Sequence, residues 1–265
     1  MKKNVVLLIG LALSAFQVVQ AATGVTIDKP KVLYRLSPGE SVTGNVGVFN
    51  PDTSATLQVK VAQNDWLLSP DGTPQFFSPG SLKTSLTGWL SLNATAFPLA
   101  AGKNTSVRYT LQVPPGTPDG LYWGLLMFNG QGEAPDAQNK PGVGVAMQLT
   151  VNVAHIIYVQ VGASKLEGRI SGMKSSLDKG QLKVSTTLRN TGNTFIGLGG
   201  RVELRDQKGV LVAQKTVDSS LVLPGFSRTF DAVFDAVAPG KYLALAALEY
   251  QQGKFYTGET QVEVK

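Results

Sequence analysis

The stretch PGVGVAMQLTVNVAHIIYVQVG, residues 141–162, alternates apolar with small or polar side chains for longer than any other part of the chain. A side-chain period of two residues is typical of a β-strand, because successive side chains point to opposite faces. One face of the stretch carries Val143, Val145, Met147, Leu149, Val151 and Val153. We therefore predict one long strand, which at about 3.3 Å per residue would span roughly 65 Å.

The alternation breaks at His155, where the sequence reads HIIY and both faces become apolar. A strand that is apolar on both faces is typical of one that is covered on both sides. This stretch also exceeds the usual strand length of about five or six residues. We expect it to close one domain and to lead into a second domain near Gly162.

The beginning of the chain indicates export. Met1 to Lys3 are positively charged, an apolar run follows from Val5 to Phe16, and the small-residue pattern VQA occupies positions 19–21. These features are typical of a signal peptide, which we predict for residues 1–21. No later segment approaches about twenty consecutive apolar residues, so we expect no membrane insertion after the signal is cleaved.

The composition excludes most catalytic chemistry. The chain has no cysteine and one histidine, and it contains no HExxH, no glycine-rich phosphate loop and no GxSxG. We therefore expect no enzymatic activity, no cofactor and no metal. The net charge of +6 is not concentrated in a dense Lys/Arg run, so we interpret it as a contribution to solubility and expect no nucleic-acid partner.

The mature chain is predicted to be all-β. From Thr23 onward, short β-type runs are separated by Gly, Pro, Asn and Asp, with no helical period of useful length. About seven strands before Gly162 and seven after it are typical of two immunoglobulin-like β-sandwiches. The halves also share local patterns, such as NPD at 50–52 and NTG at 190–192. We predict tandem domains at residues 22–162 and 163–265.

Two aromatic features of these domains have alternative interpretations. Tyr122 and Tyr242 each follow by two residues the Gly that opens a penultimate strand, where sandwiches often carry a tyrosine corner. The alternative is that each tyrosine is an ordinary residue at the edge of a core. Trp66, Trp89 and Trp123 all lie in the first half, and we expect them to be structural rather than ligand-stacking residues.

The alternating stripe is the main candidate for a binding site. A long polar loop at residues 129–142 precedes it, and long loops in compact domains tend to be mobile or functional. A strand with such a stripe can pair with another chain by β-augmentation. The alternative is that the stripe fills the core of its own sandwich. His155 lies farther along the same strand and is either a structural histidine or part of a site between the domains.

These residues resemble the periplasmic pilus chaperones of the chaperone-usher pathway. Residues 27–34 resemble the opening strand of that family, and residues 97–108 resemble its F-x-L-x-P-G…R segment. Residues 141–160 resemble its donor strand. The resemblance implies a periplasmic protein that binds an exported fibre or pilus subunit by donating the strand at 143–153. The donor residues would then be Val143, Val145, Met147 and Leu149.

The resemblance also implies a cleft that anchors the C-terminal carboxylate of the subunit. Lys31 falls where the family has a cleft arginine, and His155 falls where it has a cleft lysine, so we expect both to face one cleft. The chain departs from the family at Thr117 to Gly120, which replace a charged signature, and at Asn129-Gly130, which replace a proline pair. The alternative is a cell-surface or envelope-binding structural protein with paired immunoglobulin-like domains, similar to the WxL-interacting proteins.

Overall fold

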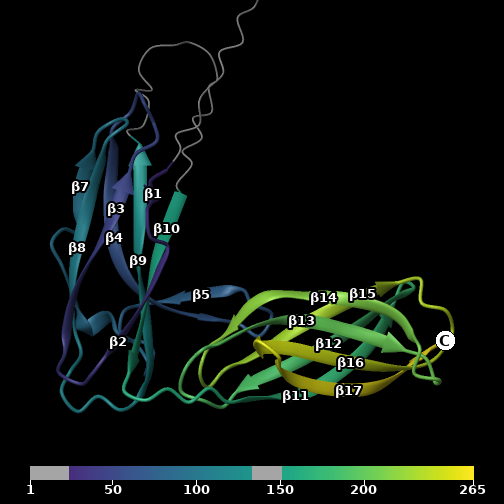
Figure 1. The fold of residues 1–265 in the computed structure, drawn as a ribbon. Coiled ribbons are helices and arrows are strands. Elements are labelled where there is room, and N and C mark those ends of the chain that lie inside the picture. The colour runs from purple at the N-terminus through teal and green to yellow at the C-terminus, as the bar shows by residue number, and fades with distance from the viewer. Residues whose placement is uncertain (1–23, 133–150) are drawn as a thin grey trace, which may run out of the picture.

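The computed structural model describes residues 24–132 and 151–265, which form β-strands arranged in four sheets (Figure 1). One short 3-10 helix occurs at Thr87–Trp89, and the described part of the chain contains no helix that could cross a membrane. The predicted signal peptide and the stripe from Val143 to Leu149 lie outside the described residues. The predicted all-β class, with two sandwiches in tandem, is confirmed.

The first sandwich is built from strands β1 to β10. One sheet has the order β1-β3-β8-β6, and the other has the order β2-β10-β9-β4-β5 with β7 also paired to β4. The strands are β1 (Thr26–Ile27), β2 (Lys31–Leu36), β3 (Ser41–Phe49), β4 (Leu57–Leu68), β5 (Pro74–Phe77), β6 (Leu90–Leu92), β7 (Ala96–Leu99), β8 (Asn104–Gln112), β9 (Gly120–Gly132) and β10 (Val151–Val161). Buried residues such as Val46, Val107 and Phe128 fill the space between the two sheets.

The second sandwich is built from strands β11 to β17. Its sheets have the orders β11-β12-β15 and β14-β13-β16-β17. The strands are β11 (Gly168–Asp178), β12 (Gln181–Asn190), β13 (Ile196–Arg205), β14 (Leu211–Val222), β15 (Ser227–Asp235), β16 (Gly240–Gln251) and β17 (Lys254–Val264). The connection between the sandwiches lies between Val161 and Gly168. The division of the chain at residue 162 stays a prediction, which limited proteolysis would test.

A tyrosine makes the same kind of hydrogen bond at the equivalent place in each sandwich. The Tyr122 hydroxyl donates to the Pro118 carbonyl at 3.2 Å, and the Tyr242 hydroxyl donates to the Ala238 carbonyl at 2.8 Å. Each bond therefore reaches back to the backbone just upstream of its strand, which is the geometry of a tyrosine corner. The tyrosine-corner interpretation is confirmed in both halves.

A buried asparagine is repeated as well. The Asn50 side-chain amide donates to the carbonyls of Ala55 and Leu99, while its carbonyl accepts from the Asp52 backbone amide. The Asn190 side chain makes the equivalent three bonds to Thr194, Val222 and Gly192. Both asparagines are fully buried, so these bonds satisfy groups that water cannot reach. These bonds explain why the sequence pattern at positions 50–52 recurs at positions 190–192.

Strand β10 serves both the first core and the contact between the sandwiches. Its odd-numbered residues Ile157, Val159 and Val161 belong to the core of the first sandwich. Its even-numbered residues Ile156 and Tyr158 belong to a separate apolar cluster that also contains residues of the second sandwich. The strand is therefore covered on both faces over this segment, as the loss of alternation at HIIY predicts.

Candidate binding site between the two sandwiches

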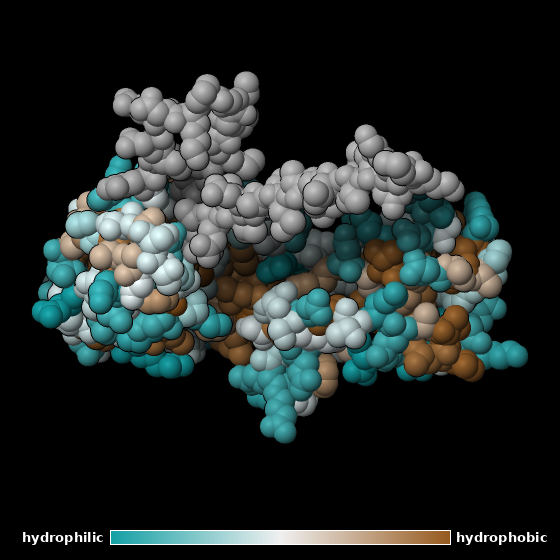
Figure 2. All heavy atoms as spheres, turned by 90° about the horizontal axis from the view of Figure 1, so that it is seen from above, coloured by the Kyte–Doolittle hydropathy of each residue, from teal (hydrophilic) through white to brown (hydrophobic). Residues whose placement is uncertain are grey.

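An apolar cluster joins the sandwiches at the inner corner of their L-shaped arrangement (Figure 1). Trp123 of β9 packs edge-on against Phe226 with ring centroids 6.3 Å apart, and Tyr158 of β10 lies 5.5 Å from Phe195. Trp66 packs edge-on against Tyr158 at 6.2 Å. In Figure 2 hydrophobic residues gather at the junction between the two lobes. Trp66 and Trp123 are thus buried structural residues, as expected.

Polar contacts hold the junction from two sides. The tip of the β4–β5 hairpin reaches the second sandwich, where the Thr229 backbone amide donates to the Pro70 carbonyl at 2.7 Å. Elsewhere the Leu121 amide donates to the Asn193 carbonyl at 2.8 Å, and the Ala163 amide donates to the Asp119 carboxylate at 3.1 Å. These contacts, together with the apolar cluster, fix the walls of the space between the sandwiches.

A cavity of about 570 Å³ lies beside the apolar cluster, within the range of ordinary small-ligand sites. Both sandwiches contribute residues to it. Its lining consists of Lys31, Val32, Leu33, Tyr158, Phe195, Gly197, Ser219, Ser220 and Leu221. The lining is mostly apolar, and Lys31 is its one charged residue.

The polar groups that line this cavity lack partners. Within residues 24–132 and 151–265, the Lys31 ammonium makes no ion pair or hydrogen bond, and neither do the hydroxyls of Tyr158, Ser219 and Ser220. Burial raises the pKa of Tyr158, so its hydroxyl remains a neutral donor at physiological pH. One cation and the Tyr158 hydroxyl on the same face of the sheet, beside an apolar cavity, suit a small anionic group such as a carboxylate.

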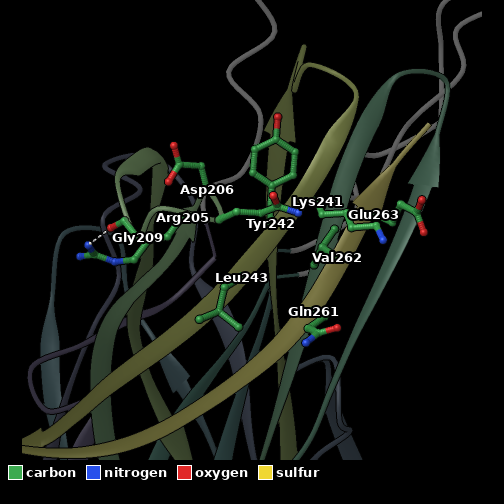
Figure 3. Close-up of a pocket in the computed structure, with 10 residues that line it drawn as sticks. Arg205, Asp206, Gly209, Lys241, Tyr242, Leu243, Gln261, Val262 and Glu263 are labelled. Atoms are coloured by element: carbon green, nitrogen blue, oxygen red, sulfur yellow. Dashed lines mark hydrogen bonds between the residues drawn. The ribbon is translucent and has the colours of Figure 1, made fainter.

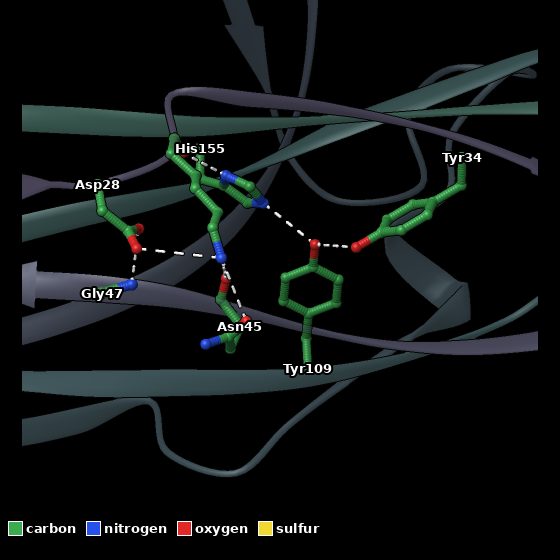
Figure 4. A network of polar contacts seen from close by, with 7 residues as sticks. Asp28, Tyr34, Asn45, Gly47, Tyr109 and His155 are labelled. Atoms are coloured by element: carbon green, nitrogen blue, oxygen red, sulfur yellow. Dashed lines mark hydrogen bonds and ion pairs between the residues drawn. The ribbon is translucent and has the colours of Figure 1, made fainter.

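His155 lies elsewhere, in the core of the first sandwich (Figure 4). Its Nδ1 donates to the Lys29 carbonyl at 2.6 Å, so Nε2 is the acceptor, and it lies 3.3 Å from the Tyr109 hydroxyl. The Tyr109 hydroxyl donates to Nε2 and accepts from the Tyr34 hydroxyl at 2.8 Å. Burial lowers the pKa of His155, which favours the neutral ring. This is the arrangement of a structural histidine.

The structure thus brings Lys31 to the cavity but leaves His155 out of it, which corrects the expectation that both face one cleft. The reason is the register of β10. Ile156 is the residue that pairs with Lys31, so these two share a face, and the preceding residue His155 points to the opposite face. His155 has the same parity as the core residues Ile157 and Val159.

Part of β10 lacks ladder pairing on its β2 side, although the segment that contains Gly24 lies against Val151 there. The strand pairs with β9 along its whole length from Val151 to Val161, but it pairs with β2 only from Ile156 onward. Residues 151–155 therefore pair with another strand on one side only. The four donor candidates Val143, Val145, Met147 and Leu149 precede this segment and lie outside the described residues.

A second hollow, of about 620 Å³, lies at the far end of the second sandwich (Figure 3). Its basic residues Arg205 and Lys241 are accompanied by the acidic residues Asp206 and Glu263. Arg205 is also bound to the Glu203 carboxylate at 2.6 Å. Charges of both signs lie side by side here, so this hollow has no net positive charge for an anion and is the weaker candidate.

Of the residues that line the cavity only Lys31 was predicted from the sequence, and the three that carry hydroxyls show why. Tyr158 belongs to the HIIY segment, whose two apolar faces indicated burial at a junction but gave no role to its hydroxyl. Ser219 and Ser220 stand in a β-type run with no motif around them. They reach the cavity through the packing of the second sandwich, which no local pattern shows.

Comparisons with known proteins concern the fold. No family model and no curated protein matches the chain. Among solved structures, it is similar to the class 5 fimbriae chaperone CfaA, with 13% identity, a TM-score of 0.46 and coverage of 91% of this chain and 100% of that chain.

Two further chaperone structures are similar to the chain. The YadV chaperone has 11% identity and a TM-score of 0.48, with 91% and 100% of the two chains covered. The E. coli chaperone DraB has 16% identity and a TM-score of 0.41, with 91% and 98% covered. At these values the similarity carries no argument about function, which is therefore inferred from the chain's own sequence and geometry.

Proposed function

We propose that this protein is an exported, periplasmic chaperone-like protein that binds fibre or pilus subunits, and that it is not an enzyme. The observation that carries the proposal is the unpaired Lys31 ammonium in an otherwise uncharged, mostly apolar cavity between two sandwiches. Lys31 is exposed, and an ammonium without a counter-ion beside apolar walls is available to donate to an anion of matching size. In this proposal the anion is the C-terminal carboxylate of a subunit.

The second part of the proposal is strand donation. Residues 151–155 pair with β9 but make no ladder with β2, and an extended chain that displaced the segment around Gly24 would pair there by β-augmentation. The alternating stripe from Val143 to Leu149 precedes this edge in the sequence, and the resemblance of residues 141–160 to a donor strand supports the same assignment. A subunit held at its carboxylate by Lys31 would then lie beside β10.

Co-production of the full chain with an exported fibre subunit tests the proposal. The subunit is sought first among the proteins encoded beside this gene. We expect the subunit to accumulate in the periplasm and to copurify with this protein. Loss of the subunit regardless of this protein, with the protein itself fractionating alone with the cell envelope, would contradict the proposal and favour an envelope-binding structural role.

A further inference from the structure

The tip of the β4–β5 hairpin, residues 69–73, is a turn that its own hydrogen bonds hold in shape. The Ser69 amide donates to the Thr73 carbonyl at 3.0 Å, and the Gly72 amide donates to the Ser69 carbonyl at 2.8 Å. The Asp71 carboxylate accepts from the Ser69 hydroxyl and from the Thr73 amide. In Figure 1 the hairpin extends from the first sandwich toward the second. The tip therefore meets the second sandwich as a preformed unit.

Two neighbouring residues of β15 contact this tip. The Thr229 amide donates to the Pro70 carbonyl at 2.7 Å. The Arg228 guanidinium lies over Gly72, where a Cβ would overlap its Nη2 atom. Gly72 also has a φ of +92°, a conformation that residues other than glycine rarely adopt. The tip fits closely against β15 because position 72 carries no side chain.

Arg228 links the tip to the cavity that Lys31 lines. Its Nη1 donates to the Leu221 carbonyl at 3.3 Å, and its guanidinium lies 5.8 Å from the centre of the Phe230 ring. Leu221 is part of the cavity wall that the second sandwich supplies. The position of the hairpin tip is therefore linked through Arg228 to one wall of the cavity.

The contact between Arg228 and the tip carries a penalty. Within residues 24–132 and 151–265 Arg228 forms no ion pair, and its buried Nε atom has no hydrogen-bond partner. Burial lowers the pKa of Arg228, although the charge of Asp71 acts in the opposite direction. A buried donor without a partner costs free energy that the same donor in water does not. Opening of the contact would remove this cost.

Other polar contacts of the junction lie beside the chain connection. The bonds from Leu121 to Asn193 and from Ala163 to Asp119 involve residues at or near the ends of the connection that follows Val161. Domains joined by a short connection move relative to each other unless further contacts restrain them. Together with the apolar cluster, the hairpin tip is such a restraint, because it joins the sandwiches through strands remote from the connection in the sequence.

We infer that the hairpin tip is a clasp that can open, and that its closed form holds the second sandwich at one orientation to the first. Closure requires the Arg228 guanidinium to lie over Gly72 and the Thr229 amide to bond to Pro70. When the clasp opens, the sandwiches turn about their connection and Leu221 changes its position relative to Lys31. The clasp works whether or not the cavity holds a ligand, so it does not depend on the proposed function.

Two measurements on the full-length mature protein test the clasp. The first is the hydrogen-exchange rate of the Thr229 amide, whose acceptor is the Pro70 carbonyl. The Phe230 amide is the reference, because neighbouring residues of a strand direct their amides to opposite sides. The second is the distance distribution between spin labels on Thr43→Cys and Gln214→Cys, one exposed position on each sandwich. The chain has no cysteine of its own, so the labels attach only there.

Gly72→Ala is the test variant and Gly80→Ala is its control. Both glycines have a positive φ, +92° and +78°, so both substitutions strain the backbone. Only at position 72 does the new Cβ meet another residue, because no atom lies within 4 Å of the Cβ position at Gly80. Arg228→Gln removes the same contact from the other partner, and it keeps the test decisive if Gly72→Ala does not fold.

We expect Gly72→Ala and Arg228→Gln to speed the exchange of Thr229 about tenfold relative to Phe230, as for the loss of one stabilising contact. Both should also broaden the distance distribution between the labels, and Gly80→Ala should change neither quantity. Unchanged exchange at Thr229 would mean that Arg228 does not hold the tip. Faster exchange with an unchanged label distribution would mean that the tip does not set the orientation. Either result, or equal effects of Gly80→Ala, would overturn the clasp.

Discussion

Lys31 and His155 lie on adjacent strands of one sheet and face opposite sides of it. Lys31 faces the cavity between the sandwiches, and His155 faces the core of the first sandwich, bonded to the Lys29 carbonyl and the Tyr109 hydroxyl. The cavity therefore has one cation instead of two. The Tyr158 hydroxyl lies on the same face as Lys31, so the chemistry of the cavity is one charge supported by a neutral hydrogen-bond donor.

The hydroxyl of Tyr158 is predicted to contribute to binding and not to folding. Tyr158→Phe keeps the ring that packs on Trp66 and Phe195 but removes a hydroxyl that has no partner in the described part of the chain. We expect an unchanged melting temperature and an affinity for the subunit about three- to tenfold lower, as for one lost hydrogen bond. Titration calorimetry beside a melting curve checks this. A large fall in stability with unchanged affinity would show that the hydroxyl is structural.

The burial of His155 should make the free energy of unfolding depend on pH. Burial lowers the pKa of the folded ring below its ordinary value of 6.5, whereas the ring of the unfolded chain keeps that value. As the pH falls below about 6.5, the unfolded state takes up a proton that the folded state does not, so the free energy of unfolding decreases. Above about pH 7 neither state binds the proton and this contribution is constant.

The substitution His155→Gln isolates this effect, because the chain has no other histidine. Urea unfolding at about pH 7.5 and about pH 5.5 should show a smaller loss of stability on acidification for the variant than for the wild type. The difference is limited to about 1.4 kcal/mol per pH unit below 6.5. Parallel losses in the two proteins would mean that His155 is not buried in its neutral form.

Gly44 is predicted to be required for the packing of Tyr109. The two residues are paired across β3 and β8, and a Cβ at Gly44 would overlap the Tyr109 ring. Gly44→Ala should therefore destabilise the protein by about 1–3 kcal/mol, the usual cost of overpacking a core. Gly88 has no atom within 4 Å of its Cβ position, so Gly88→Ala serves as a control and should change stability by less than about 0.5 kcal/mol. Equal effects in urea unfolding would contradict the packing argument.

Leu149 distinguishes strand donation from a core role for the stripe. Leu149→Glu puts a carboxylate on the apolar side of the alternation, and Thr150→Glu puts one on the other side. If the stripe binds a subunit, Leu149→Glu should abolish copurification while the free protein melts normally, and Thr150→Glu should do neither. If the stripe fills its own core, Leu149→Glu should instead cost several kcal/mol, because the charge would be buried without a partner.

Much of the fold is predictable from the sequence because it depends on local patterns. The alternation, the turn residues and the repeated Asn and Gly-x-Tyr motifs are sufficient for two all-β sandwiches, and the buried bonds of Asn50 and Asn190 show why the repeat exists. The site is less predictable because it depends on register and tertiary packing. The shared parity of His155 with Ile157 and Val159 already indicates the core face. Ser219, by contrast, lines the cavity only because the two sandwiches dock against each other.

The affinity of the Lys31→Gln variant for the co-produced subunit tests the central claim most directly. Arg35→Gln is the matched control, because Arg35 is an exposed cation on the same strand, with the same parity, but outside the cavity. We predict that Lys31→Gln weakens binding by about ten- to a hundredfold, that Lys31→Arg restores most of it, and that Arg35→Gln changes it little. Unchanged binding by Lys31→Gln, or equal losses for Lys31→Gln and Arg35→Gln, would contradict a carboxylate site at the junction.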